Sequence, residues 1–136
     1  MIAPVRGRGI ELILMRQLAS CLAAPIVLCD PRGDLIYVNE PAEELLGLRV
    51  GESDTVSVHE LADRLCVRDD TGERLSWDQL PNRLAASSGR AVQRRLLIRG
   101  SDGRERRLDA TAFPLVSPVG ENVGTVSIFW ESTDEG

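Results

Sequence analysis

The chain has 136 residues, of which 43% are hydrophobic and 27% are charged. This composition is typical of a globular domain that buries its own core, and it excludes a wholly disordered chain. The formal net charge of −5 argues against a general nucleic-acid-binding protein, because such proteins carry a basic excess. The apolar stretch near the N-terminus is interrupted by polar residues and a proline. We therefore expect no signal peptide and no membrane contact, and we expect a cytoplasmic protein.

The first predicted element is an amphipathic helix over residues 10–22, which follows a flexible tail at residues 1–9. Apolar residues recur there at the three- and four-residue spacing of a helix face, and further apolar residues widen that face. Such a helix either packs with a wide stripe on one core or contacts both its own domain and a second subunit. In the second case the dimer interface contains Ile10, Ile13, Leu14 and Leu18.

A β-hairpin is predicted to follow this helix. Residues 26–29 form a short apolar strand, and residues 34–38 form the returning strand. Between them, the sequence Asp-Pro-Arg-Gly at 30–33 has the residue preferences of a tight turn. Asn39 then caps a helix that Gly47 ends.

The middle of the chain predicts short helices separated by turns. Residues 58–65 form a helix that presents one apolar face, made by Val58, Leu61, Ala62 and Leu65. Residues 68–74 are a turn. A further helix is capped by Ser76 and runs to about residue 87. Pro81 comes late for a first-turn proline, so this helix either starts later or is irregular.

Three strands are predicted at the C-terminal end, over residues 92–99, 106–113 and 125–130. Apolar and polar residues alternate along each of them, which indicates an antiparallel sheet with one covered face. Two groups of strands separated by helices and closing one sheet give an α+β fold.

This ordered set of features resembles the PAS domain. The resemblance covers about residues 10–133 and begins with IVLCDPRGDLIYVNEPAEELLG at 26–47. It continues through Leu80-Pro81 and Gly89, and it ends with the Asp102-Gly103 turn and the strand TVSIFWE. The resemblance implies a five-stranded antiparallel sheet in the order 2-1-5-4-3, with helices over one face and the amphipathic helix at the N-terminus. It also implies a single domain over residues 10–133, with residues 134–136 as a tail.

The resemblance further implies a sensory or regulatory module of bacterial-type signal transduction, which senses a small ligand or redox state and signals through dimer or partner contacts. A homodimer is favoured, because PAS domains often dimerise through such a helix. The alternative is a ligand-free module for protein–protein interaction or dimerisation. Residues that would line or fill the pocket are Trp77, Leu80, Leu84, Ile98 and Trp130, although the two tryptophans are also compatible with plain core packing.

PAS domains often end in an Asp-x-Thr triplet that links the last strand to an output element. The corresponding residues here are Glu131-Ser132-Thr133, so Glu131 and Thr133 are candidates for that role. The alternative is an ordinary strand end. No output domain is recognisable, so the chain either acts on a separate signalling effector or is a fragment of a longer signalling protein, and Met1 favours a complete small protein.

The sequence does not identify a cofactor, and we expect neither an enzyme nor a metal site. Haem is not expected, because the single histidine, His59, lies earlier than the histidine that haem-binding PAS domains use. A flavin–cysteine adduct is not expected, because neither Cys66 nor Cys29 lies in the Asn-Cys-Arg motif of light-sensing PAS domains. The cysteines, Cys21 included, are interpreted as small apolar residues in a reducing compartment.

Overall fold

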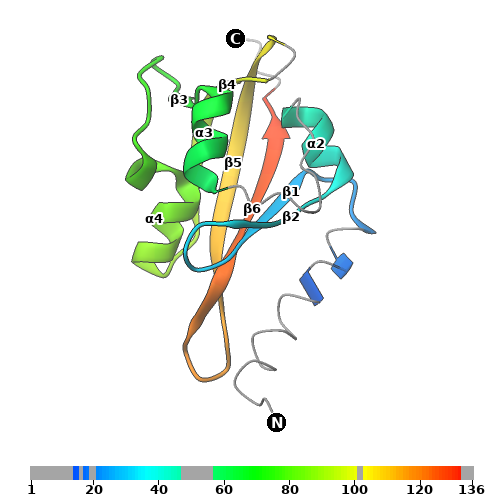
Figure 1. Cartoon of the computed structure of the whole chain (residues 1–136), viewed down its shortest axis with the longest axis vertical. Coiled ribbons are helices and arrows are strands. Elements are labelled where there is room, and N and C mark those ends of the chain that lie inside the picture. The colour runs from blue at the N-terminus through cyan, green and yellow to red at the C-terminus, as the bar shows by residue number, and fades with distance from the viewer. Residues whose placement is uncertain (1–13, 16, 19–20, 47–56, 101–102, 133–136) are drawn as a thin grey trace.

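The chain forms one six-stranded antiparallel sheet with helices packed over one of its faces (Figure 1). The computed structural model describes residues 14–15, 17–18, 21–46, 57–100 and 103–132. The strand order is β2-β1-β6-β5-β4-β3. In chain order the elements are β1 (Ile26–Cys29), β2 (Leu35–Val38), α2 (Glu40–Leu46), α3 (Val58–Leu65), β3 (Arg68–Asp69), the 3₁₀ helix η1 (Trp77–Gln79), α4 (Pro81–Ser88), β4 (Val92–Arg99), β5 (Glu105–Val116) and β6 (Asn122–Glu131).

The five strands expected from the sequence are confirmed, and they lie in the expected order. The structure adds a sixth strand, β3, which pairs with β4 at the edge of the sheet. The sequence predicts only a turn there, and the turn is also present, because the Asp69 carboxylate accepts hydrogen bonds from the backbone N–H groups of Thr71 and Glu73.

The irregular helix start near Pro81 takes the form of two separate elements. Ser76 is the N-cap of η1, and the chain is extended at Leu80. Helix α4 then begins at Pro81, where a missing backbone N–H costs nothing, and it ends at Gly89 with φ of +71°.

Asn39 joins the start of α2 to the chain at the start of β1. Its Oδ1 accepts hydrogen bonds from the backbone N–H of Ala42, at 3.0 Å, and of Ile26, at 2.9 Å. Its Nδ2 donates to the carbonyl oxygen of Ala24 at 2.8 Å. Asn39 is 2% exposed, so the predicted helix cap also fixes the beginning of β1 from inside the protein.

Apolar residues are buried on both faces of the central strands, whereas the alternation in the sequence predicts one covered face. The inner face, under the helices, carries the larger core. The outer face carries a second cluster in which Ile26, Leu28 and Val126 are buried, and Met15 packs against it. Met15 therefore covers part of the face that the sequence pattern leaves open.

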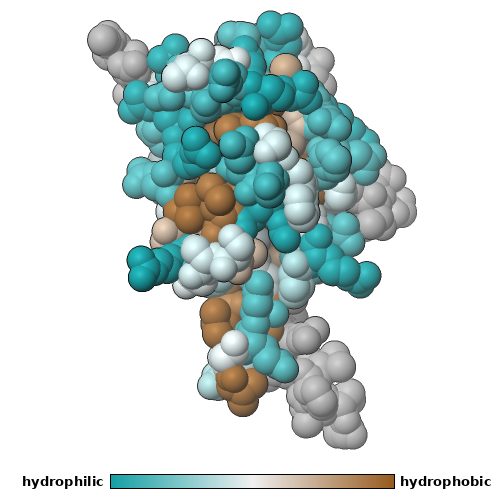
Figure 2. Space-filling model, turned by 90° about the vertical axis from the view of Figure 1, so that its left-hand side faces the viewer, coloured by the Kyte–Doolittle hydropathy of each residue, from teal (hydrophilic) through white to brown (hydrophobic). Residues whose placement is uncertain are grey.

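The surface over α3 and α4 is mainly hydrophilic, and apolar atoms gather at the lower end of the molecule (Figure 2). The turn between β5 and β6 projects there, and Val116 and Val119 are 52% and 80% exposed.

None of the helices in the described part of the chain has the length and apolar character that crossing a bilayer requires. The proposed division at residues 9 and 133 falls outside the described residues and stays a prediction.

Candidate functional site

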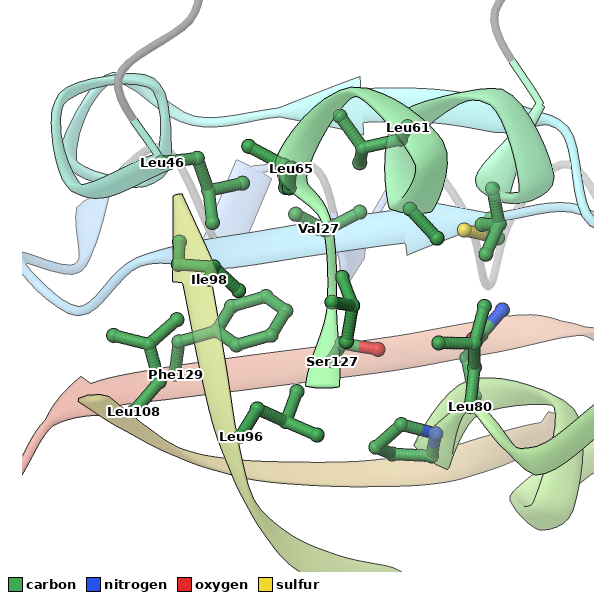
Figure 3. A pocket seen from close by; sticks show the side chains of 16 residues that line it. Val27, Leu46, Leu61, Leu65, Leu80, Leu96, Ile98, Leu108, Ser127 and Phe129 are labelled. Carbon is green, nitrogen blue, oxygen red and sulfur yellow. The ribbon is translucent and has the colours of Figure 1, made fainter. Parts of the chain in front are cut away.

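A cavity of about 70 Å³ lies between the helices and the inner face of the sheet. Helix α3 forms one wall with the four residues of its predicted apolar face, Val58, Leu61, Ala62 and Leu65. Leu96 and Ile98 of β4, and Ser127 and Phe129 of β6, contribute to the wall on the sheet side (Figure 3). The cavity, which is partly open to solvent, is therefore lined mainly by aliphatic and aromatic carbon atoms.

Helix α3 is held over the cavity by a cap at each end. The Ser57 hydroxyl accepts a hydrogen bond from the Glu60 N–H at 3.0 Å, which caps the N-terminus. Cys66 ends the helix in the left-handed conformation, with φ of +52°, and its N–H donates to the Asp63 carbonyl. The chain then turns directly into Val67, which also lines the cavity.

Three lining side chains bring polar atoms to this apolar wall: Asn82, Ser127 and Cys29. Asn82 lies in the first turn of α4, is 6% exposed, and its Nδ2 is buried without a hydrogen-bond partner. Burial raises the pKa of the Cys29 thiol to about 12, with a smaller contribution from the charge of Asp30. The thiol is therefore protonated at neutral pH and is a poor nucleophile.

The five pocket candidates named from the sequence divide into two groups. Leu80 and Ile98 line the cavity. Trp77, Leu84 and Trp130 are not among its lining residues, and the two tryptophans are 39% and 47% exposed, so they are not core residues either. The Arg83 guanidinium instead stacks on the Trp77 ring, with its Cζ 4.3 Å from the ring centroid.

Asn82, Cys29 and Phe129 line the cavity but are not among the residues predicted from the sequence. For Cys29 and Phe129 the available signal was strand alternation, because inner-face residues of β1 and β6 recur at every second position. For Asn82 no signal was available, since its burial depends on where α4 docks on the sheet.

The candidate dimer residues are only partly described. Ile10 and Ile13 lie outside the described residues. Leu14 and Leu18 are helical and are 58% and 49% exposed, while Met15 between them faces the outer cluster of the sheet. The described part of this segment therefore contacts the domain with one side and leaves leucines exposed on another.

The candidate output triplet is also partly described. Glu131 is the last residue of β6 and is exposed, and it pairs with Leu108 of β5. The Ser132 N–H donates to the Arg107 carbonyl at 2.7 Å, so the pairing of the two strands continues one residue further. Thr133 lies outside the described residues.

His59 lies on the exposed side of α3, with its Nε2 3.9 Å from the Asp63 carboxylate, and it is not a lining residue of the cavity. Over the residues whose placement is described, no group of three His, Cys, Asp or Glu side chains could hold a metal ion. Of the cysteines, Cys29 is buried, Cys66 is partly buried and Cys21 is exposed.

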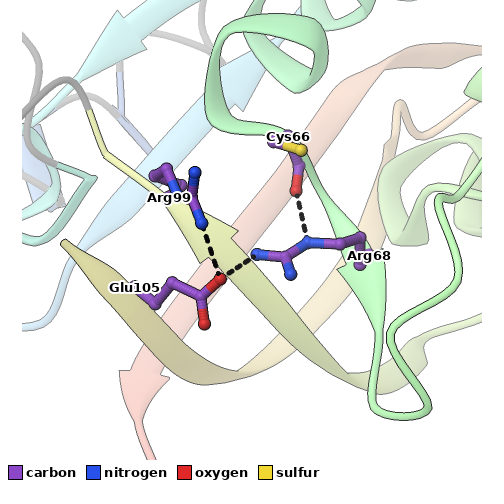
Figure 4. A network of polar contacts seen from close by, with 4 residues as sticks. All are labelled: Cys66, Arg68, Arg99 and Glu105. Atoms are coloured by element: carbon purple, nitrogen blue, oxygen red, sulfur yellow. Dashed lines mark hydrogen bonds and ion pairs between the residues drawn. The ribbon is translucent and has the colours of Figure 1, made fainter. Parts of the chain in front are cut away.

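A polar network fastens β3 to the sheet outside the cavity (Figure 4). The Glu105 carboxylate accepts hydrogen bonds from Arg68 and Arg99, each at 3.1 Å. These bonds lower the pKa of Glu105 below its ordinary value, and the bond from Arg68 has the larger effect. Arg68 also donates through Nε to the Cys66 carbonyl, so one arginine connects the end of α3 to the hairpin of β4 and β5.

The sequence profile of the PAS domain matches residues 14–81, which is half of the chain. The comparison with curated protein sequences finds no significant match.

Solved structures with the same fold include the PAS domain of nitrogen regulation protein NR(II) from Vibrio parahaemolyticus, at 16% identity and a TM-score of 0.59, over 88% of this chain and 98% of that one. The light-state dimer of the fungal blue-light photoreceptor Vivid has 17% identity and a TM-score of 0.61, over 80% of this chain and 78% of that one. The phage VqmA–DPO complex has 21% identity and a TM-score of 0.63, over 94% of this chain and 56% of that one. At these identities the similarity supports the fold alone.

Proposed function

The chain belongs to the PAS domain family, and on this premise we propose that it is a sensory module whose input is a small molecule bound in the cavity behind α3 and α4. PAS domains are sensory signalling modules and are generally not catalytic. The observation that carries the proposal is the partly open apolar cavity on the inner face of the sheet, with Asn82 and Ser127 in its wall. Apolar pockets with a few convergent polar groups are the usual form of small-molecule sites.

A ligand fits this site better than a redox signal at its cysteine. The Cys29 thiol is buried and its pKa is raised to about 12, so little reactive thiolate is present near neutral pH. A structural relative, phage VqmA, was solved as a complex with DPO.

For the output we propose a homodimer, formed through the N-terminal segment and contacting a signalling effector protein, with residues 10–133 acting as one domain. The support is the arrangement around Met15, which packs on the outer face of the sheet while Leu14 and Leu18 stay exposed beside it. A structural relative, Vivid, forms a light-state dimer. A ligand alters this outer face only if it binds two conformations of the sheet with different affinity.

The volume of the cavity favours a second candidate, a ligand-free interaction module. About 70 Å³ is small beside the 300–1,000 Å³ that is common for drug-sized ligands. In this reading the cavity is a packing defect, and the function lies wholly in the outer face and the N-terminal segment.

Native mass spectrometry of the untagged chain, with an absorption spectrum from the same sample, separates the two candidates. The proposed function expects an added mass that leaves when the protein is denatured. A clean apo mass, together with no response of the lining residues to any added small molecule, contradicts it and favours the interaction module.

The dimer is tested by size-exclusion chromatography with light scattering on the double variant Leu14→Glu, Leu18→Glu and on the chain lacking residues 1–22. We expect both to be monomers. Val119→Glu is the matched control, because Val119 is 80% exposed at the far hairpin tip, and we expect it to remain dimeric. A truncated chain that still runs as a dimer excludes the N-terminal segment as the interface.

A further inference from the structure

Three buried polar side-chain atoms among the described residues have no hydrogen-bond partner, and one of them belongs to the lining residue Asn82. They are Asn82 Nδ2, Arg83 Nε and Thr125 Oγ1. Asn82 and Arg83 are consecutive residues of α4. Thr125 precedes the lining residue Ser127 by two positions on β6 and therefore shares its face of the sheet.

Thr125 and Arg83 both lie near the lining residue Cys29. Thr125 is the cross-strand partner of Cys29, and Cys29 lines the cavity. The Thr125 hydroxyl faces the thiol without a hydrogen bond of regular geometry. Arg83 lies close enough for its positive charge to act on the same thiol, and its Nη1 is 3.5 Å from the position a Cβ at Gly33 would take.

The three atoms share one hydrogen-bonding character. An amide NH₂ and a guanidinium N–H donate only, and a hydroxyl also donates. Arg83 takes part in none of the ion pairs found in the described part of the chain, and its guanidinium rests on the Trp77 ring. A buried donor without a partner destabilises the protein by about 1–3 kcal/mol. A ligand whose acceptor binds this donor recovers that free energy.

The opposite end of the cavity is apolar. Figure 3 shows Leu80, two residues before Asn82, at one end of the cavity and Leu46, Ile98 and Phe129 toward the other, with Ser127 between them. The two ends of the wall therefore differ, with the Asn82 donor near the start of α4 and carbon atoms toward α2.

We infer that the cavity takes a small molecule with an apolar body and one oxygen acceptor, a carbonyl or a carboxylate, which Asn82 Nδ2 receives at the α4 end. This inference rests on the proposed function and names the chemistry of its ligand. The body has few non-hydrogen atoms, because a cavity of about 150 Å³ holds one benzene and this one is about half as large.

The test compares molecules of nearly equal shape that differ in the acceptor. In 2-butanone a C=O group stands where 2-methyl-1-butene has C=CH₂, and n-butylammonium offers donors only. Each is titrated into ¹⁵N-labelled full chain, and the dissociation constant is taken from the amide shifts of Ile98, Ser127 and Phe129. We expect 2-butanone to bind about tenfold to a hundredfold more tightly than the alkene, as one rescued buried donor implies.

Asn82→Asp replaces the donor by an acceptor of nearly the same size and is expected to remove the preference for the ketone. Asn122→Asp is the control, because Asn122 is not a lining residue, and it is expected to keep that preference.

Butyrate distinguishes a carboxylate acceptor from a neutral carbonyl acceptor. Binding of butyrate above 2-butanone assigns a carboxylate, and the reverse assigns a neutral carbonyl.

Equal binding of ketone and alkene, or tighter binding of n-butylammonium, overturns the inference and leaves the proposed ligand-binding function standing. If no probe shifts the amides of the lining residues, both the inference and the proposed function fail.

Discussion

Filling the cavity from α3 tests whether it is a true void within the core. Ala62 lines the cavity from the middle of the helix, and leucine keeps a high helix propensity while adding three carbons to that wall. Void volume costs about 24 cal/mol per Å³, so about 70 Å³ corresponds to at most ~1.7 kcal/mol. We expect Ala62→Leu to raise the free energy of unfolding by about 1 kcal/mol, because some of this gain is lost to imperfect fit.

Urea denaturation followed by circular dichroism gives the difference directly. The matched control is Ala86→Leu, the same substitution at a half-buried position of the equally long α4, which does not line the cavity and is expected to change stability little. The same Ala62→Leu chain should lose affinity for any cavity ligand. If Ala62→Leu lowers the free energy of unfolding, its added carbons meet packed atoms and the reasoning is refuted.

Three further outcomes follow from other features of the fold. Asn39→Ala should lower the free energy of unfolding by about 3 kcal/mol, since it leaves three backbone groups, at Ala24, Ile26 and Ala42, without their side-chain hydrogen bond. The variant Ser57→Ala, at an exposed cap, should cost about 1 kcal/mol, and equal losses in urea denaturation would contradict this. The pKa of Glu105 is lowered in the folded state, so its stabilising effect is present above the ordinary carboxyl pKa and is lost as the pH falls through the folded pKa. Glu105→Gln should therefore flatten the acid decline of the melting temperature, and an unchanged acid limb would refute the assignment. Cys66→Gly should stabilise the chain by about 1 kcal/mol in the same denaturation assay, because glycine adopts a positive φ without strain, and a loss of stability would oppose that account.

The strands and hairpins could be predicted because their signals are local. Alternation over six to eight residues and the Asp-Pro-Arg-Gly turn at 30–33 depend on neighbours in the chain, and the same holds for the cap at Asn39. Strand β3 could not be predicted, because two residues are too few to show alternation. It exists through pairing with Leu96 and Leu97 of β4, and that pairing is a property of the folded sheet.

The candidate site was less accessible from the sequence than the fold. The apolar face of α3 was visible as a helical stripe, and the structure places that stripe on the cavity. The exposure of Trp77 and Trp130 was not visible, since a large aromatic side chain is compatible with core, pocket and surface alike. The unpartnered donors of Asn82 and Arg83 appear only when α4 is docked on the sheet.

The position of β1 within the sheet has a consequence for how the protein is made. Strand β1 lies between β2 and β6, so every residue of this buried strand needs a neighbour near the other end of the chain, as in the pair Ile26 and Ile128. During synthesis the hairpin of β1 and β2 emerges first and keeps one apolar edge open until β6 leaves the ribosome. Closing so long a loop slows folding, and an open apolar edge is prone to pair with other chains. Until β6 is in place, the open edge of β1 therefore exposes the nascent chain to pairing with other chains.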